Sequence, residues 1–390
     1  MKLAAAAYVA FAAFGVFWGT WGAALPALRD GAGLTDGQLG GALLWIGAGA
    51  LPSMALIGRA IDRFGVRMTG IPLILLALTG LGLSLYARDI TTLSIGMLLV
   101  GATSGAADVA ANALAGLAER RSGRRVITLA HAVFSSFVVA GSLGAGALLA
   151  VSDGLDAAFL MCGLLVAAAG VTVLVLAEGP APRALRPPST SPDRRLRALL
   201  PFLAAGLIGA LGFAIENAHQ SWSAIFFADE LHASPLIAAF APATFAAFSA
   251  ATRFGVGAFR RIPDVVLLFG GAIAAAAGTL LLSASQSIVW AVAGLAVAAV
   301  GTSVLFPTLL SRATRDVPDE QRGRATSIVG TTAYLGFLLG PVYVGLLAGG
   351  LGLRTAMVGV AVLALAFAVF APAFTRRGQR ADQRAESRAE

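Results

Sequence analysis

Apolar residues fill long runs of this chain, and short polar segments separate the runs. Windows of about 19 residues find twelve runs, each long enough to cross a hydrocarbon core of roughly 30 Å as a helix. Because lipid offers the backbone no hydrogen-bond partner, such spans fold as α-helices. The pattern predicts an all-α membrane protein of twelve transmembrane helices. The predicted spans are 4–28, 38–57, 68–87, 91–118, 126–150, 157–177, 199–227, 235–254, 264–284, 288–311, 325–349 and 354–374.

A segment rich in proline and arginine divides the twelve runs into six and six. Residues 178–197 contain five prolines and five arginines, so we predict a cytoplasmic linker there. The six-helix bundles on either side occupy 1–177 and 198–375. The tail at 376–390 contains no apolar residue larger than alanine. It is therefore predicted to be disordered and cytoplasmic.

Basic residues are distributed unequally between alternate connections. Of the 28 Lys and Arg residues, 25 fall on one predicted side of the membrane, and only Arg29, Arg88 and Arg354 fall on the other. Because basic residues accumulate in cytoplasmic loops, we predict a multi-pass protein of the cytoplasmic (inner) membrane with both termini in the cytoplasm. The net charge of +8 then reflects topology, and we expect no nucleic-acid partner.

The composition excludes an ordinary soluble enzyme. The chain is 58 % hydrophobic and 12 % charged, whereas soluble domains are about 25 % charged. The single cysteine, Cys162, lies in an apolar run and provides no metal-ligand spacing. A clustered nucleophile and base is also missing, as is a nucleotide-binding signature. We therefore expect no enzymatic activity, no cofactor, no metal and no use of ATP.

The connection between the second and third runs combines glycines, one acid and several bases at fixed spacing. It reads Gly58-Arg59-Ala60-Ile61-Asp62-Arg63-Phe64-Gly65-Val66-Arg67. This segment resembles the loop signature of the major facilitator superfamily, which implies two pseudo-symmetric six-helix bundles. In that family the acidic residue contacts helix ends of the other half, a role that Asp62 would inherit. The residues of this expected conformational latch are Gly58, Asp62, Arg63, Gly65 and Arg67.

Other stretches resemble one branch of that superfamily. Those around Asp108 to Asn112, His131 to Ser135, Glu216 to Ser223 and Tyr334 to Pro341 are similar to the fucose-permease-like and YbjJ-like branch. The resemblance implies secondary active transport by alternating access and leaves the substrate open. The second-half loop at 253–261 lacks the acidic residue of the signature.

Two carboxylates interrupt apolar runs near the middle of the membrane. At about 1.5 Å per residue, Asp108 lies about 28 Å from Asp89 and about 16 Å from Glu119, and Glu216 is similarly central. A charge at this depth costs at least about 2.5 kcal/mol. With no basic partner expected, each carboxyl should favour its protonated form. We predict that Asp108 and Glu216 couple transport to protons; the alternatives are permanently protonated structural acids or direct pairing with a cationic substrate.

Polar and aromatic side chains at similar depth are candidates for substrate contact. Helical spacing places Asn112 on the face of Asp108 and Gln220 on the face of Glu216. Asn112 and His131 are expected at similar depth and can hydrogen-bond, although a buried neutral histidine fits His131 equally well. Tryptophans near span ends are also typical interface anchors. The substrate-binding candidates are Trp18, Asn112, His131, His219, Gln220, Trp222 and Tyr334.

These features predict a monomeric secondary transporter that moves a small organic solute through the lipid bilayer. Coupling to protons suits either symport or antiport. Sparse hydrogen-bonding groups favour an apolar cargo, so an efflux antiporter for an apolar or cationic drug or metabolite is one alternative. A non-transporting membrane sensor of the same fold is another.

The predicted topology can be tested by labelling single cysteines in a Cys162→Ser background. Intact cells that carry Glu230→Cys should react with an impermeant maleimide, whereas cells that carry Thr190→Cys should react only after lysis. Labelling of position 190 from outside, or none at position 230, would overturn the assignment of sides.

Overall fold

A computed structural model describes residues 2–152, 154–177, 192–258, 262–315, 317 and 319–386. Side chains are described for these residues apart from 192–198, 257–258, 319–324 and 372–386. The chain divides into two compact units. Unit 1 comprises Met1–Arg186, Gln220–Ala247 and Gly345–Leu353, and unit 2 comprises Pro187–His219, Phe248–Val344 and Arg354–Glu390.

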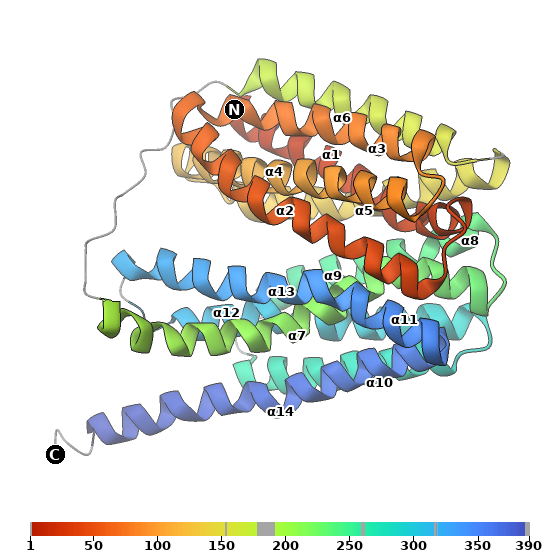
Figure 1. Cartoon of the computed structure of the whole chain (residues 1–390). Helices are drawn as coiled ribbons and strands as arrows, with labels where there is room; N and C mark the ends of the chain where they lie inside the picture. The colour runs from red at the N-terminus through yellow and green to blue at the C-terminus, as the bar shows by residue number, and fades with distance from the viewer. Residues whose placement is uncertain are drawn as a thin grey trace. The chain divides into compact units, whose positions relative to one another are not determined.

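Unit 1 contains the first six long helices and the ends of later ones. α1 packs on α5 and α6, α2 packs on α4, and α3 packs on α4 and α6 (Figure 1). Its elements are α1 (Lys2–Gly31), α2 (Asp36–Phe64), η1 (Val66–Thr69), α3 (Gly70–Tyr86), α4 (Ile90–Ser122), α5 (Val126–Val151), α6 (Asp156–Leu176) and α8 (Pro235–Ala238). Three further helices contribute to both units: α7 (Pro192–Glu230), α9 (Phe240–Ala258) and α13 (Asp319–Leu351).

Unit 2 contains the remaining helices, among which α10 packs on α11. Its elements are η2 (Val266–Gly270), α10 (Gly271–Ala284), α11 (Ile288–Thr302), α12 (Leu305–Thr314) and α14 (Leu353–Glu386). The helical backbone of α14 continues to Glu386, which differs from the disorder expected from residue 376 onward. The tail is rich in Ala, Arg, Gln and Glu, which are good helix formers even without a packed face.

The prediction of an all-α protein with twelve transmembrane helices is confirmed. In the described residues, twelve helical segments are long and apolar enough to cross a membrane. Two of the spans are interrupted: α8 with α9 forms the eighth, and α11 with α12 forms the tenth. The domain boundaries expected from the sequence stay a prediction, because residues 178–191 and 387–390 lie outside the described residues.

The signature segment is more helical than a plain loop. α2 continues through Phe64, so Gly58 to Phe64 form its last turns, and η1 begins at Val66. Between them Gly65 has φ of +84°, a left-handed conformation that only glycine adopts without steric cost. The second glycine of the signature therefore ends α2 and turns the chain into α3.

Small residues allow neighbouring helices to approach closely. A Cβ atom added to Gly101 would overlap the carbonyl oxygen of Ile46, and one added to Gly105 would lie 2.8 Å from Cα of Ala50. α4 therefore lies almost backbone to backbone on α2. Between membrane helices such contacts replace the hydrophobic driving force that lipid removes.

Substituting Gly101 by alanine should destabilise the α2–α4 contact, because the helices must separate to admit the new methyl group. We expect a loss of about 1–3 kcal/mol, the usual cost of overpacking, measured as a lower unfolding temperature in detergent. Gly82→Ala is the matched control, since no atom lies within 4 Å of its added Cβ. Equal unfolding temperatures for the two variants would contradict the close packing.

Candidate functional site

The carboxylate of Asp108 is held by its own helix. Asn112, one turn later on α4, donates from Nδ2 to Asp108 Oδ1 at 3.0 Å and to the Asp108 carbonyl at 2.9 Å. Both side chains are half-buried in unit 1. The arrangement confirms that the two residues share one helix face. The expected hydrogen bond between Asn112 and His131 stays a prediction.

Glu216 has a basic partner, which corrects the expectation that it has none at its depth. Arg253 on α9 donates from Nη2 to both carboxylate oxygens of Glu216, at 2.9 and 3.1 Å. The Glu216 side chain is 11 % exposed and that of Arg253 is 42 % exposed. The sequence places Arg253 in a basic connection, but the membrane-spanning helix continues to Val256. The long side chain can therefore reach a mid-helix acid.

A break between α11 and α12 orients this arginine. Pro307 has no N–H, so the helix cannot pair the carbonyl of Ser303, four residues earlier. Arg253 Nε donates to that carbonyl oxygen at 3.2 Å while Nη2 holds Glu216. One guanidinium thus satisfies a free backbone acceptor and a buried carboxylate.

A second carbonyl freed by a proline is also paired by a side chain, in this case from α7. Pro341 lies inside α13 and leaves the carbonyl of Phe337 without its helical donor. Asn217 donates to that oxygen from Nδ2. His219, completely buried, contacts the Ile215 carbonyl through Nδ1 at 2.8 Å and the Thr279 hydroxyl through Nε2 at 3.0 Å. His219 thus has structural partners at both ring nitrogens.

An aromatic cluster lies on α1 and α5 in unit 1. Trp18 is half-buried and makes edge contacts with Phe14, Phe17 and Trp21, at centroid distances of 5.8–6.2 Å. His131 is exposed and packs its ring edge to face on Phe11 at 4.8 Å. Trp18 and His131 are thus placed among aromatic side chains of the same unit.

A second aromatic cluster lies on α7, α12 and α13 in unit 2. Tyr334 stacks on Phe337 at 5.5 Å, and Phe213 contacts both Phe337 and Phe306. Of the remaining predicted substrate residues, Gln220 is half-buried, whereas Trp222 is completely buried in unit 1. Asp108 and Glu216 belong to different units, and their predicted joint role in proton coupling stays a prediction.

The predicted latch residues differ in the contacts that their side chains make. Arg67 donates from Nε to the Leu174 carbonyl at 2.7 Å and so caps the end of α6. The Arg63 guanidinium lies 5.3 Å from the ring centre of Phe64. Asp62 is exposed and has no hydrogen-bond or ion-pair partner among the described residues. Its contact with helix ends of the other half stays a prediction, as does a latch role for Gly58.

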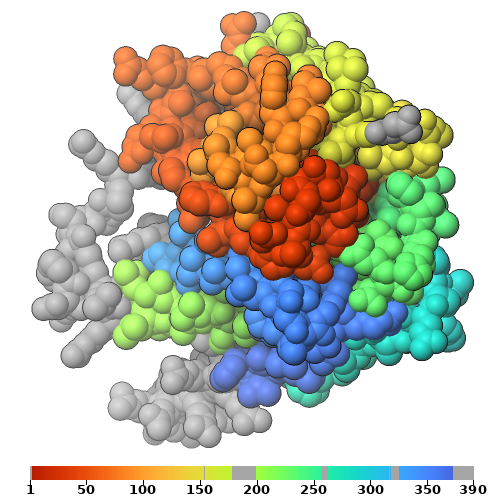
Figure 2. Space-filling view, turned by 45° about the vertical axis from the view of Figure 1, so that its right-hand side comes forward, coloured from red at the N-terminus to blue at the C-terminus, as the bar shows by residue number. Residues whose placement is uncertain are grey.

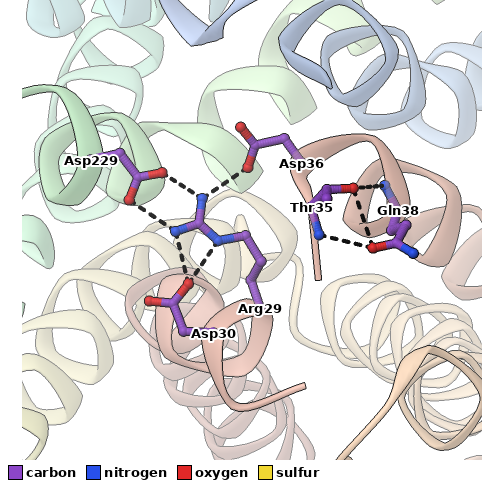
Figure 3. A network of polar contacts seen from close by, with 6 residues as sticks. All are labelled: Arg29, Asp30, Thr35, Asp36, Gln38 and Asp229. Carbon is purple, nitrogen blue, oxygen red and sulfur yellow. Dashed lines mark hydrogen bonds and ion pairs between the residues drawn. The ribbon is translucent and has the colours of Figure 1, made fainter. Parts of the chain in front are cut away.

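A network around Arg29 is a feature that the sequence did not predict. The guanidinium at the end of α1 binds Asp229 at the end of α7 through two nitrogens, at 2.5 and 2.9 Å (Figure 3). It also binds Asp36 at the start of α2 at 2.8 Å, and Asp30 at 2.9 Å. Figure 2 shows the red surface near residue 30 beside the green surface near residue 230. The signal in the sequence is Arg29 itself, because it is one of only three basic residues on the predicted outer side of the membrane.

The Arg29 network contains more negative than positive charge. Arg29 is 10 % exposed, whereas the three carboxylates are 21–66 % exposed. One guanidinium neutralises one unit of charge, so the group carries an excess of about two negative charges when all three acids are ionised. Arg29 is therefore the element that keeps Asp36 and Asp229 close together.

Family comparison agrees with the fold of a multi-pass helical membrane protein. The family model of the Major Facilitator Superfamily matches residues 6–341 and 221–390. The chain belongs to this superfamily and is a membrane transporter of that type.

Two similar proteins and one similar structure are consistent with this membership. An uncharacterized transporter, y4wD, of Sinorhizobium fredii is 29 % identical over 89 % of this chain and 92 % of its own length. An uncharacterized MFS-type transporter of Yersinia pestis is 28 % identical, with 90 % of both chains covered. A bacterial homologue of the human lysosomal transporter Spinster, solved in an inward-facing and occupied conformation, has a TM-score of 0.77 at 16 % identity. It covers 96 % of both chains. At that identity the likeness extends to the fold alone.

Removal of Arg29 should destabilise the protein more than removal of any one of its acids. Arg29→Gln leaves three carboxylates unneutralised and should cost roughly 3 kcal/mol, the low end for a buried pair because the carboxylates are partly exposed. Asp30→Asn, at an exposed pair, should cost less than about 1 kcal/mol. Unfolding temperatures in detergent at neutral pH would measure the order. A larger loss for Asp30→Asn than for Arg29→Gln would contradict the central place of Arg29 in the network.

Proposed function

We propose that the protein is a secondary active transporter that moves a small organic solute by alternating access and couples it to protons. The observation that carries the proposal is a set of polar groups within membrane helices. Asp108 is bonded to Asn112, and Glu216 is bonded to Arg253. Both acids sit where a charge is costly unless it is paired or neutralised by a proton.

Glu216 has the chemistry of a proton switch. While it is ionised, it fixes Arg253; when it is protonated, the ion pair is lost and Arg253 keeps only the Ser303 carbonyl. The released guanidinium is then free to bind an anionic group or to move with α9. Asp108 can also take up and release a proton, because Asn112 can donate a hydrogen bond to its carboxyl group whether that group is ionised or protonated.

The Arg29 network supports the gating part of the proposal. It ties the end of α1 and the start of α2, from the first half of the chain, to the end of α7 in the second half. On the predicted topology this end faces outward. Breaking only the Arg29–Asp229 contact frees α7 and leaves Arg29 paired with Asp30 and Asp36. The gate can therefore open without isolating a buried charge.

Efflux of an apolar or cationic compound is the second candidate. The two aromatic clusters, on α1 with α5 and on α7 with α13, favour it. Aromatic faces accept both apolar rings and cations.

The main proposal also includes substrate contacts through Trp18, His131, Gln220 and Tyr334. It further includes membership of the fucose-permease-like or YbjJ-like branch, an inner-membrane location, cytoplasmic termini and a monomeric state.

Proton coupling can be tested once a thermal-shift screen of sugars, polyols, amines and antibiotics has identified a ligand. In reconstituted vesicles with an imposed pH gradient, Asp108→Asn or Glu216→Gln should abolish concentrative transport of that ligand. Ligand binding and downhill exchange should persist, because the surrounding side chains remain.

Asp264→Asn is the matched control, since Asp264 pairs with Arg315 outside the predicted coupling groups. Full gradient-driven accumulation in both coupling variants would contradict the proton role. Weakened binding of a cationic ligand would instead indicate that the acids pair with cargo directly.

A further inference from the structure

A cavity of about 620 Å³ opens in unit 1 at the end that holds the start of α1. The end of α4, the start of α5 and the last residue of α6 complete its wall. Three of its lining side chains are basic: Lys2, Arg121 and Arg124. In the described part of the chain, no carboxylate lines it.

The three basic side chains are not used to stabilise the described part of the protein. None of their side chains forms a hydrogen bond or ion pair there. The nearby acid Glu119 is already engaged, because its Oε2 accepts from the backbone N–H of Ile127 at 3.0 Å. The end of α4 is closed by Gly123, whose N–H donates to the Glu119 carbonyl at 2.9 Å. The basic groups are therefore free to face a ligand.

Apart from Ser122, the rest of the wall is mainly apolar. Leu3, Tyr8, Val126 and Leu176 line the same cavity as the three cations. A ligand that fits must present a compact anion to one part of the wall and hydrocarbon to the other. A phospholipid with an anionic head group has this chemistry, and basic pockets between membrane helices suit it.

We propose that this cavity binds the head group of an anionic phospholipid, with Lys2, Arg121 and Arg124 around the phosphate. The site holds the ends of α1, α4, α5 and α6 together through one bound lipid. It is independent of the transported solute and of the coupling acids.

The test uses the purified full-length protein in detergent, titrated with phosphatidylglycerol and followed by unfolding temperature and native mass spectrometry. Wild-type protein should bind one tightly held lipid and gain thermal stability. Arg121→Gln with Arg124→Gln should weaken that binding about 30-fold, since each basic residue near an anionic lipid contributes roughly a factor of five. Arg59→Gln with Arg312→Gln removes the same charge elsewhere and should leave binding unchanged.

Further experiments distinguish an anionic lipid from a neutral lipid and from a soluble anion. Phosphatidylcholine, which has no net charge, should protect weakly, and Arg121→Lys with Arg124→Lys should retain binding. Equal weakening in both glutamine pairs, or equal protection by phosphatidylcholine, would overturn the site. Protection by inorganic phosphate or glycerol phosphate at the same concentrations would show that the ligand is a soluble anion, which would overturn the lipid assignment.

Discussion

In a membrane span, every backbone carbonyl must find a donor within the protein, because lipid supplies none. In unit 2, two of the prolines within spans each leave a carbonyl without its helical donor, and a side chain of another helix pairs it. Pro307 frees the carbonyl of Ser303, and Pro341 frees that of Phe337. Arg253 and Asn217 then satisfy these two acceptors. The need to pair these carbonyls therefore fixes one donor on α9 and one on α7, and the donor on α9, Arg253, also holds Glu216 of α7.

The Arg29 network follows from a related constraint at the ends of the helices. A guanidinium that is mostly buried requires carboxylates, and here they come from α1, α2 and α7. Two of the acids lie close to Arg29 in the chain, so Arg29 stays paired whether or not Asp229 is present. This redundancy is what a contact that breaks and reforms requires. It distinguishes the Arg29–Asp229 pair from Arg253–Glu216, where Glu216 is the only carboxylate seen on the guanidinium in the described residues.

The sequence predicted most of the fold and only part of the candidate site. Twelve apolar runs and their order could be read directly, since lipid selects for long apolar helices. Helical spacing also brought Asp108 and Asn112 together correctly. Arg253 lies 37 residues from Glu216, and Asp229 lies 200 residues from Arg29. Periodicity on one helix says nothing about such contacts between helices, and Arg253 was further obscured because a basic residue near a span end usually indicates only topology.

Transport by the proposed gate requires the ends of α1 and α7 to separate and rejoin. Spin labels at Gly31→Cys and Ser234→Cys, in a Cys162→Ser background in lipid, would report the distance between them by pulsed electron resonance. We expect two distance populations, with the longer one enriched by Asp229→Asn and not by Asp36→Asn. The second variant removes an acid from the same guanidinium without touching α7. A single short distance in wild type and in both variants would contradict a gate at Arg29.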